Sequence, residues 1–319
     1  MRYGRVGAAL AISGLLTVGL GTGCGRPDPQ SAAPAAGPAG SSASPDPPAV
    51  PAAGPMLPPA PRRLGSSAGA APAPSCPAQP AGFDCDLRRR IAAAQSYAED
   101  RPGFTGIVLR DRSTGAVWRN DSSGSLVWTA STIKLAMAVD LLTRERAGTV
   151  QLSQTDRSTM DRMLRVSDDE AADTLWFRYG GPGYGTRFPS YGLTSATFVA
   201  GFQHYWGWMK CTTDDLDRLM RYVLERMPAA DRAYLVDTLR GVGANQQWGV
   251  WGAGAAARPG NKDGWSLEQG GWVINSVGFV GPGERYTLAI MNSLRGEGGY
   301  PEGVATDTHI AALLFAGRF

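Results

Sequence analysis

Histidine is scarce in this 319-residue chain, which has only His204 and His309. Neither lies beside a cysteine or a pair of acids, so no metal site and no cofactor are predicted. Long runs of lysine and arginine are also absent, and the formal net charge is only +3. The sequence therefore lacks the electrostatic pattern of a nucleic-acid-binding protein. Two histidines still allow a Ser-His-Asp hydrolase, which we keep as the second choice.

Cysteine is also rare, with four residues at Cys24, Cys76, Cys85 and Cys211. None of them opens a helix beside a basic partner, which argues against a catalytic thiolate. The three cysteines that follow Cys24 allow at most one intramolecular disulfide. Cys76 to Cys85 and Cys85 to Cys211 both remain open as pairings.

The first 24 residues have the pattern of an export signal. Arg2 and Arg5 precede an uncharged stretch, 6–23, that ends in small residues. The run Gly21-Thr-Gly-Cys24 resembles the signal of bacterial lipoproteins, which implies that Cys24 is lipidated and anchors the protein to a membrane. An ordinary cleaved signal and an uncleaved anchor are the alternatives. All three place the rest of the chain outside the cytoplasm.

Proline is distributed unevenly, because 16 of the 23 prolines lie between Gly25 and Gly82. This Ala/Pro/Gly/Ser-rich stretch cannot bury enough apolar surface to offset the entropy of ordering, so a disordered tether is predicted over 25–82. The remaining 83–319 is long enough for a domain with a proper core.

Sheet-forming segments lie at both ends of this domain and helices lie in the middle. This order predicts an α/β fold of two lobes, with an antiparallel sheet and helices contributed by both chain ends and an inserted all-helical lobe. The predicted strands are 106–109, 115–119, 260–265, 272–280 and 286–292. The predicted helices are 87–99, 131–146, 161–165, 171–179, 213–226, 229–239 and 304–315.

Three short motifs carry the chemistry. They are Ser131-Thr-Ile-Lys134 at the start of a helix, Ser167-Asp-Asp169 between two helices, and Lys262-Asp-Gly264 on a strand. A spacing of three places Ser131 and Lys134 on one helical face, where a lysine of lowered pKa can take the serine proton. In order and context the motifs resemble those of the penicillin-recognising serine enzymes, the class A β-lactamases and the related D,D-peptidases.

The resemblance implies a role for each matching residue. Ser131 would be the nucleophile that forms an acyl-enzyme, and Lys134 its proton acceptor. Ser167 would relay a proton to the leaving nitrogen, helped by the field of Lys262. The backbone N–H groups of Ser131 and Trp265 would form the oxyanion hole.

The second and third motifs also contain departures from the family. Asp168 is expected to be a buried structural hydrogen-bonding residue. Asp169 stands where the family has Asn, and Asp263, before Gly264, stands where it has Thr or Ser, in the segments that contact substrate. An ionised carboxylate only accepts hydrogen bonds and repels a substrate carboxylate. A changed substrate preference, toward a neutral or cationic group, is therefore predicted.

A third departure concerns the loop that follows the second motif. Class A β-lactamases carry there a glutamate that activates the deacylating water, whereas 180–213 contains no Asp or Glu. We therefore predict an exported, monomeric serine acyl-enzyme that hydrolyses or transfers a peptide or amide bond, such as one in a cell-wall peptide, and that is not an efficient β-lactamase. A genuine β-lactamase acting on β-lactam antibiotics and an inactive ligand-binding lipoprotein on the same fold are the alternatives.

Overall fold

The computed structural model describes residues 76–319. The predicted export signal, Cys24 and most of the predicted tether lie outside the described residues. Eight strands form two sheets within this part of the chain: β1 Phe104–Asp111, β2 Val117–Arg119, β3 Val127–Trp128, β4 Thr197–Phe198, β5 Met209–Cys211, β6 Gly260–Glu268, β7 Gly271–Val280 and β8 Tyr286–Ser293. The α-helices of the same part are α1 Cys85–Glu99, α2 Ile133–Arg146, α3 Gln154–Arg165, α4 Asp169–Tyr179, α5 Gly183–Arg187, α6 Thr213–Glu225, α7 Ala229–Arg240 and α8 Tyr300–Phe315.

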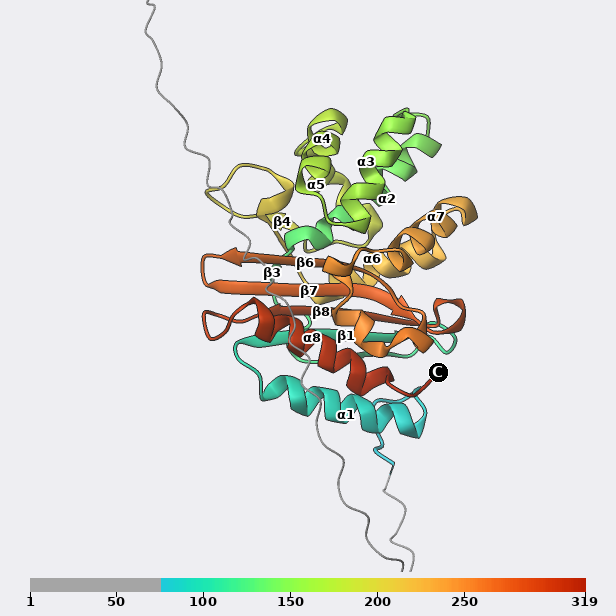
Figure 1. The fold of residues 1–319 in the computed structure, drawn as a ribbon, viewed down its shortest axis with the longest axis vertical. Helices are drawn as coiled ribbons and strands as arrows, with labels where there is room; N and C mark the ends of the chain where they lie inside the picture. Colours follow the sequence, from blue (N-terminus) through green and yellow to red (C-terminus); the bar gives the residue numbers. More distant parts are fainter. Residues whose placement is uncertain (1–75) are drawn as a thin grey trace, which may run out of the picture. The chain divides into compact units, whose positions relative to one another are not determined.

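The larger sheet joins the two ends of the domain. Its order is β2-β1-β8-β7-β6, every neighbouring pair is antiparallel, and Ile107 of β1 lies opposite Ile290 of β8. β6 pairs only with β7, so its outer edge is free to meet other groups. The smaller sheet has the order β3-β5-β4. The strand that carries the third motif is therefore an edge strand (Figure 1).

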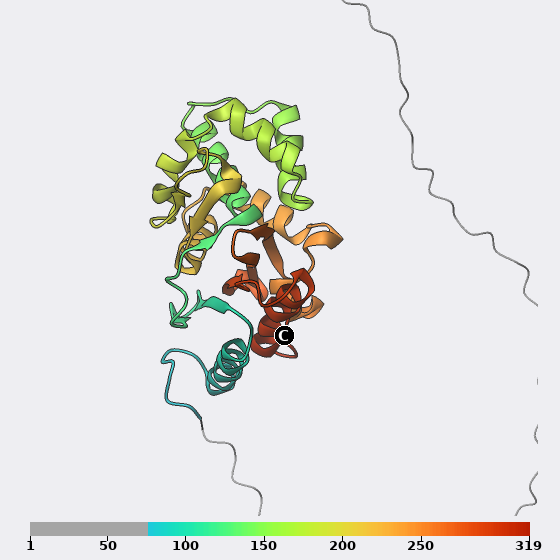
Figure 2. The same cartoon turned by 90° about the vertical axis from the view of Figure 1, so that its left-hand side faces the viewer.

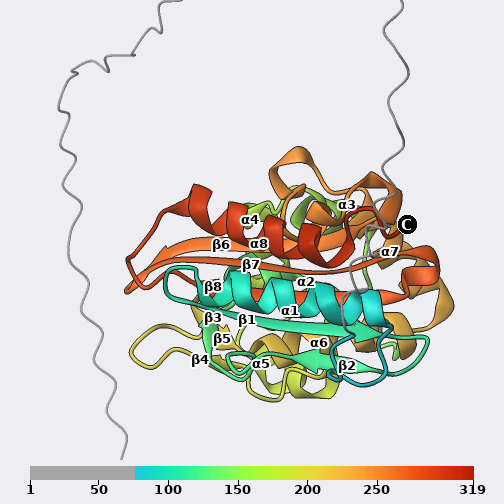
Figure 3. The ribbon, with the colours of Figure 1, turned by 90° about the horizontal axis from the view of Figure 1, so that it is seen from below.

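The larger sheet is covered on both faces. α1 and α8 pack side by side on one face, where Leu87 and Ile91 of α1 meet Ile310 and Leu314 of α8 in a buried cluster (Figure 3). α6 and the helices of the middle segment lie on the opposite face (Figure 2). Side chains of the strands alternate between the cluster beneath α1 and α8 and a second buried cluster on the opposite face, as the two-residue period of a strand requires.

α2 is the central helix of the helical lobe. Ten consecutive residues, from Ile133 to Leu142, are buried. A helix that is buried all round is held by its neighbours rather than by its own helical propensity. The first turn of α2 follows Ser131 directly, so the predicted nucleophile lies at the start of the most firmly packed helix of the lobe.

The predicted two-lobe fold is confirmed, with three differences in detail. α3 begins at Gln154, where Ser153 and Asp156 form a capping box, and not at 161. The strands β3, β4 and β5 were not predicted, because two or three residues show no periodicity. Of the two open pairings the disulfide joins Cys76 to Cys85, and Cys211 is buried and unpaired.

Among the residues that the structure describes, none of the helices combines the length and the apolar character needed to span a bilayer.

Candidate active site

Ser131 lies in a short 3-10 helix, η1 (Ala130–Thr132), that leads into α2. The residue before it, Ala130, has a φ of +43°, a left-handed conformation that costs a non-glycine residue free energy. Ala130 and Thr132 are buried, whereas Ser131 is half-buried. In the described part of the chain no hydrogen bond is recorded for its Oγ, so the hydroxyl is open to a substrate.

Two residues of the sheet hold this turn in place. Asn275 of β7 donates from Nδ2 to the carbonyl oxygens of Trp128, at 2.9 Å, and Thr129, at 3.2 Å. Gly264 of β6 approaches so closely that a Cβ there would lie 2.8 Å from the amide nitrogen of Ser131. The glycine of the third motif is therefore needed for backbone contact with the nucleophile. Asn275 has no counterpart among the sequence-based expectations.

Lys134 is fully buried one turn after Ser131. Its Nζ donates to the carbonyl oxygen of Ser167 at 2.8 Å and to Asp169 Oδ1 at 2.5 Å. Burial lowers the pKa of Lys134, and the hydrogen bond and negative charge of Asp169 oppose this shift. Lys134 is thus a lysine whose neutral form has become more accessible, which a general base requires.

Ser167 lies between two lysines. Its φ is +60°, again unusual for a residue with a side chain. Its Oγ accepts from Lys262 Nζ at 2.9 Å and from Lys134 Nζ at 3.5 Å. Lys262 is fully buried, and burial together with the charge of Lys134 lowers its pKa well below the ordinary value. The structure therefore brings together Lys134, Ser167 and Lys262 as the motifs predict.

The free edge of β6 supplies backbone N–H groups. The N–H of Asp263 points off this edge, since it donates to Gln246 Oε1 at 3.3 Å. Successive N–H groups of a strand alternate in direction, so that of Trp265, two residues on, points the same way. Gly264, between them, touches the amide of Ser131. The N–H of Trp265 therefore points off the free edge of β6, and the oxyanion hole that it would form with the N–H of Ser131 stays a prediction.

The carboxylates of the second and third motifs are placed differently from the expectation. Asp263 is fully buried, and its carboxylate accepts a hydrogen bond from Asn261 Nδ2 at 2.6 Å. Because neighbouring residues of a strand point to opposite faces, Asp263 lies on the face of β6 opposite to Lys262. Burial raises the pKa of Asp263 well above its ordinary value. This buried position on the far face does not support the predicted contact of Asp263 with substrate.

Asp168 and Asp169 flank the start of α4. Asp168 caps the helix by accepting from the N–H of Ala171 at 2.9 Å, and it is half-buried rather than buried. The side chain of Asp169 is 72% exposed, yet it pairs with the buried Lys134. Asp169 is therefore the exposed counter-ion of Lys134 rather than a free contact for substrate.

Comparison with known proteins places this chain in a family. No family model matches the chain. Over 216 residues it is 31% identical to the proteins named "Putative lipoprotein LppW" of Mycobacterium tuberculosis and Mycobacterium bovis, an alignment that covers 64% of this chain and 68% of theirs. The chain belongs to the LppW family.

Solved structures show which fold this LppW-family chain has. A β-lactamase from Streptosporangium roseum matches with a TM-score of 0.59 at 18% identity, covering 71% of this chain and 97% of that one. The ancestral class A β-lactamase GNCA matches with a TM-score of 0.58 at 18% identity, covering 71% and 98%. At such identities the likeness establishes the fold alone, which is that of the class A β-lactamases.

In this member of the LppW family the loop between α4 and α6 places aromatic residues beside Lys134. The ring of Trp206 lies 4.6 Å from Lys134 Nζ and is almost fully buried. Its Nε1 donates to Asp173 Oδ1 at 2.8 Å, and the hydroxyl of Tyr205 donates to the same oxygen. Burial and the Asp173 carboxylate raise the pKa of Tyr205. An aromatic ring, held by an acid of α4, therefore faces the lysine in this acid-free loop.

The sequence indicates no role for Trp206, Asp173 or Gln246. Trp206 and Gln246 each contact a motif lysine only through the tertiary fold, so no local pattern indicates them.

Proposed function

We propose that this protein is an exported serine acyl-enzyme that cleaves or transfers a peptide or amide bond through an ester on Ser131. The observation that carries the proposal is the arrangement of two fully buried lysines, Lys134 and Lys262, around the hydroxyl of Ser167, beside a half-buried Ser131. Burying two ammonium groups is costly, so a site that retains both favours a chemical use for them.

The proposed acylation step follows from these positions. The Oγ of Ser131 attacks the carbonyl carbon, its proton passes to Lys134, and the N–H groups of Ser131 and Trp265 stabilise the oxyanion. The C–N bond then breaks as Ser167 gives its proton to the leaving nitrogen and regains one from the neighbouring lysines. The products are an acyl ester on Ser131 and a free amine.

Release of the acyl group is proposed to be slow with water. The loop 180–213 contains no carboxylate that could activate a water, and Trp206 lies against Lys134. An efficient β-lactamase needs rapid hydrolysis of its acyl-enzyme, so a peptidase, transferase or esterase fits this site better. The relatives are named "Putative lipoprotein LppW", which supports lipidation of Cys24, tethering to a membrane, and a substrate outside the cytoplasm such as a cell-wall peptide. We further propose that the protein acts as a monomer.

Intact-mass analysis with a fluorophosphonate tests the nucleophile. One adduct on the wild-type protein and none on Ser131→Ala is the expected result, with much slower labelling of Lys134→Ala. A fluorescent penicillin, added under the same conditions, is expected to label slowly and to be released slowly. Fast release with turnover of a chromogenic β-lactam would favour the β-lactamase alternative.

The ion pair between Lys134 and Asp169 favours a second candidate. A lysine held protonated cannot accept the proton of Ser131, and the fold would then serve as a ligand-binding lipoprotein. Folded wild-type protein that gives no phosphonate adduct at any alkaline pH would support this binding role over catalysis.

A further inference from the structure

Lys262 has no hydrogen-bond donor left for a substrate. A lysine Nζ carries at most three N–H donors. Those of Lys262 meet Ser167 Oγ at 2.9 Å, the carbonyl oxygen of Asp263 at 2.8 Å, and Gln246 Oε1. Lys262 is also fully buried. A substrate carboxylate could reach it only by displacing one of these three acceptors.

Gln246 is fixed in this position from both sides. Its Oε1 accepts from Lys262 and from the edge N–H of Asp263. Its Nε2 donates to the carbonyl oxygens of Leu164, at 2.7 Å, and Arg165, at 2.9 Å. The residue is fully buried. The glutamine amide therefore blocks the edge of β6 at position 263 and presents a neutral oxygen, which a carboxylate would have to approach or expel.

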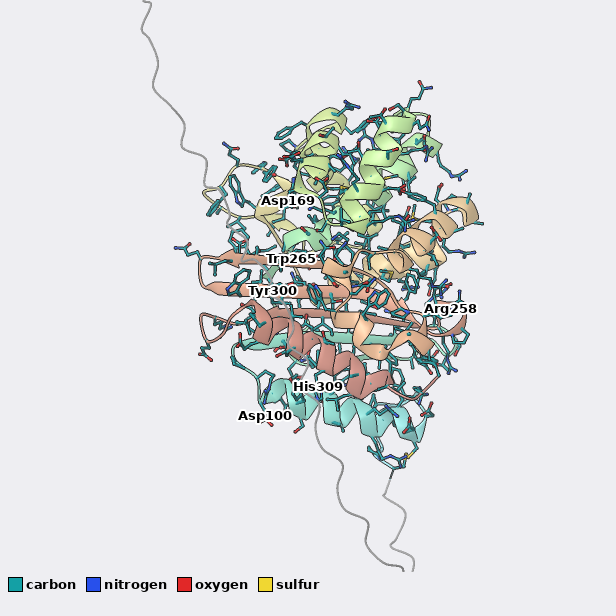
Figure 4. The ribbon with its side chains drawn as sticks, in the orientation of Figure 1. Asp100, Asp169, Arg258, Trp265, Tyr300 and His309 are labelled. Atoms are coloured by element: carbon teal, nitrogen blue, oxygen red, sulfur yellow. A yellow bond between two sulfur atoms is a disulfide. The ribbon has the colours of Figure 1, made fainter. Side chains whose placement is uncertain are left out.

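The aromatic residues around Trp265 lie on the other face of β6. Because neighbouring residues of a strand point to opposite faces, Trp265 lies on the face opposite to Lys262 and Gly264. Trp265 packs against Trp248, with ring centroids 6.0 Å apart, and against Tyr300 at 6.1 Å. Figure 4 shows Tyr300 on the side of Trp265 away from Asp169. The restriction at Lys262 therefore depends on Gln246 and not on this aromatic cluster.

We infer that Gln246 is a specificity-determining residue, which restricts the site to substrates whose group beyond the scissile bond is uncharged. An amidated or otherwise neutral peptide end fits beside Gln246, and a free carboxylate does not. A carboxylate would lose its water without gaining a donor, which is costly in a buried site. The inference rests on the proposed function and names its substrate class.

Two thioester probes test the inference. They share one acylglycyl group and differ only in the leaving thiol, which ends in a carboxylate in one and in a carboxamide in the other. In the wild-type protein kcat/KM for the carboxamide probe is expected to exceed that for the carboxylate probe by at least about tenfold. Gln246→Ala frees a donor of Lys262 and is expected to reduce this ratio by at least about tenfold. Gln247→Ala, at the exposed neighbouring position, is the matched control and should keep the wild-type ratio.

The ratio is measured within each protein, so a smaller folded fraction does not change it. Equal wild-type rates for the two probes, or an unchanged ratio in Gln246→Ala, would overturn the inference. If Gln246→Ala melts far below the wild type, Gln246→Met keeps the side-chain length and replaces it. Binding of both probes to Ser131→Ala by calorimetry gives a ratio of Kd values that needs no catalysis. Absent acylation contradicts the proposed function, whereas equal Kd values contradict the role of Gln246.

Discussion

Replacing Asp169 with asparagine is the most direct probe of Lys134, the proposed proton acceptor, since it removes one negative charge and keeps the shape. Asp169 Oδ1 lies 2.5 Å from Lys134 Nζ, and its charge favours the protonated lysine. Without that charge the pKa of Lys134, already lowered by burial, falls further. The neutral, proton-accepting form of the lysine is then more abundant at every pH below that pKa.

The size of the effect follows from exposure. Two unit charges about 4 Å apart interact by about 4 kcal/mol at the effective dielectric constant of a protein surface. The side chain of Asp169 is 72% exposed, so solvent screens much of this interaction. We expect about 1.4 kcal/mol to remain, which corresponds to a shift of about one unit in the pKa of Lys134. Acylation on the rising limb of the pH profile should therefore become about tenfold faster in Asp169→Asn.

The assay is the second-order rate of phosphonate labelling at Ser131 as a function of pH. The wild-type rate is expected to rise with pH to a midpoint below the ordinary lysine pKa of about 10.4, and that of Asp169→Asn to a midpoint about one unit lower. Glu170→Gln removes a neighbouring charge that has no ion pair with Lys134 and should move the midpoint far less. A midpoint that stays in place or moves upward in folded Asp169→Asn would refute the reasoning.

Three further changes have distinct expected outcomes. Trp206→Ala opens space beside Lys134, so the acyl adduct should hydrolyse at least about tenfold faster, as measured by the decay of its intact mass. Gly264→Ala places a Cβ 2.8 Å from the amide nitrogen of Ser131 and should slow acylation by about a hundredfold, while far-UV circular dichroism stays unchanged. Asp263→Asn removes a buried acid of raised pKa, and thermal melts should show a stabilisation that grows as pH rises. A raised pKa in the folded state means that stability is lost as pH rises above the unfolded value of about 3.9.

The Trp206→Ala prediction has a matched control variant. Trp208→Ala changes a neighbouring aromatic residue that has no contact with Lys134 Nζ, and the lifetime of the adduct should then stay near the wild-type value. If the adduct is as stable in Trp206→Ala as in the wild type, Trp206 does not exclude water from the acyl-enzyme. For Asp263→Asn, a stabilisation that is largest in acid would show that the native carboxyl is ionised.

Much of the fold could be predicted because its main elements carry local signals. β7 and β8 are apolar runs bounded by glycines, and α6 opens with Thr212 and Asp215, which form a capping box. β3, β4 and β5 exist only because the tertiary fold brings their backbones together. The start of α3 has the same kind of signal in the capping pair Ser153 and Asp156, and the prediction of a helix that begins at 161 leaves this signal out.

The candidate site was predictable to the extent that sequence spacing determines it. The three motifs identified the lysines and Ser167, and the fold brings them together. Asp263 was misplaced because the motif was treated as one surface, whereas a strand sends adjacent side chains to opposite faces. Trp206 and Gln246 could not be predicted, because they meet Lys134 and Lys262 through contacts that no periodic pattern records.

The two lysines explain why these partners matter. Lys134 and Lys262 both contact Ser167, and their charges repel, so the pKa of Lys262 is lowered by Lys134 as well as by burial. Lys134 pairs with the carboxylate of Asp169. Apart from Ser167, the side chain that accepts from Lys262 is the neutral amide of Gln246. A proton shared between the lysines is therefore more stable on Lys134. In the proposed acylation that proton must first leave Lys134. We therefore expect Asp169, which stands where the β-lactamases have Asn, to act first on the proton balance of the site and only then on the substrate.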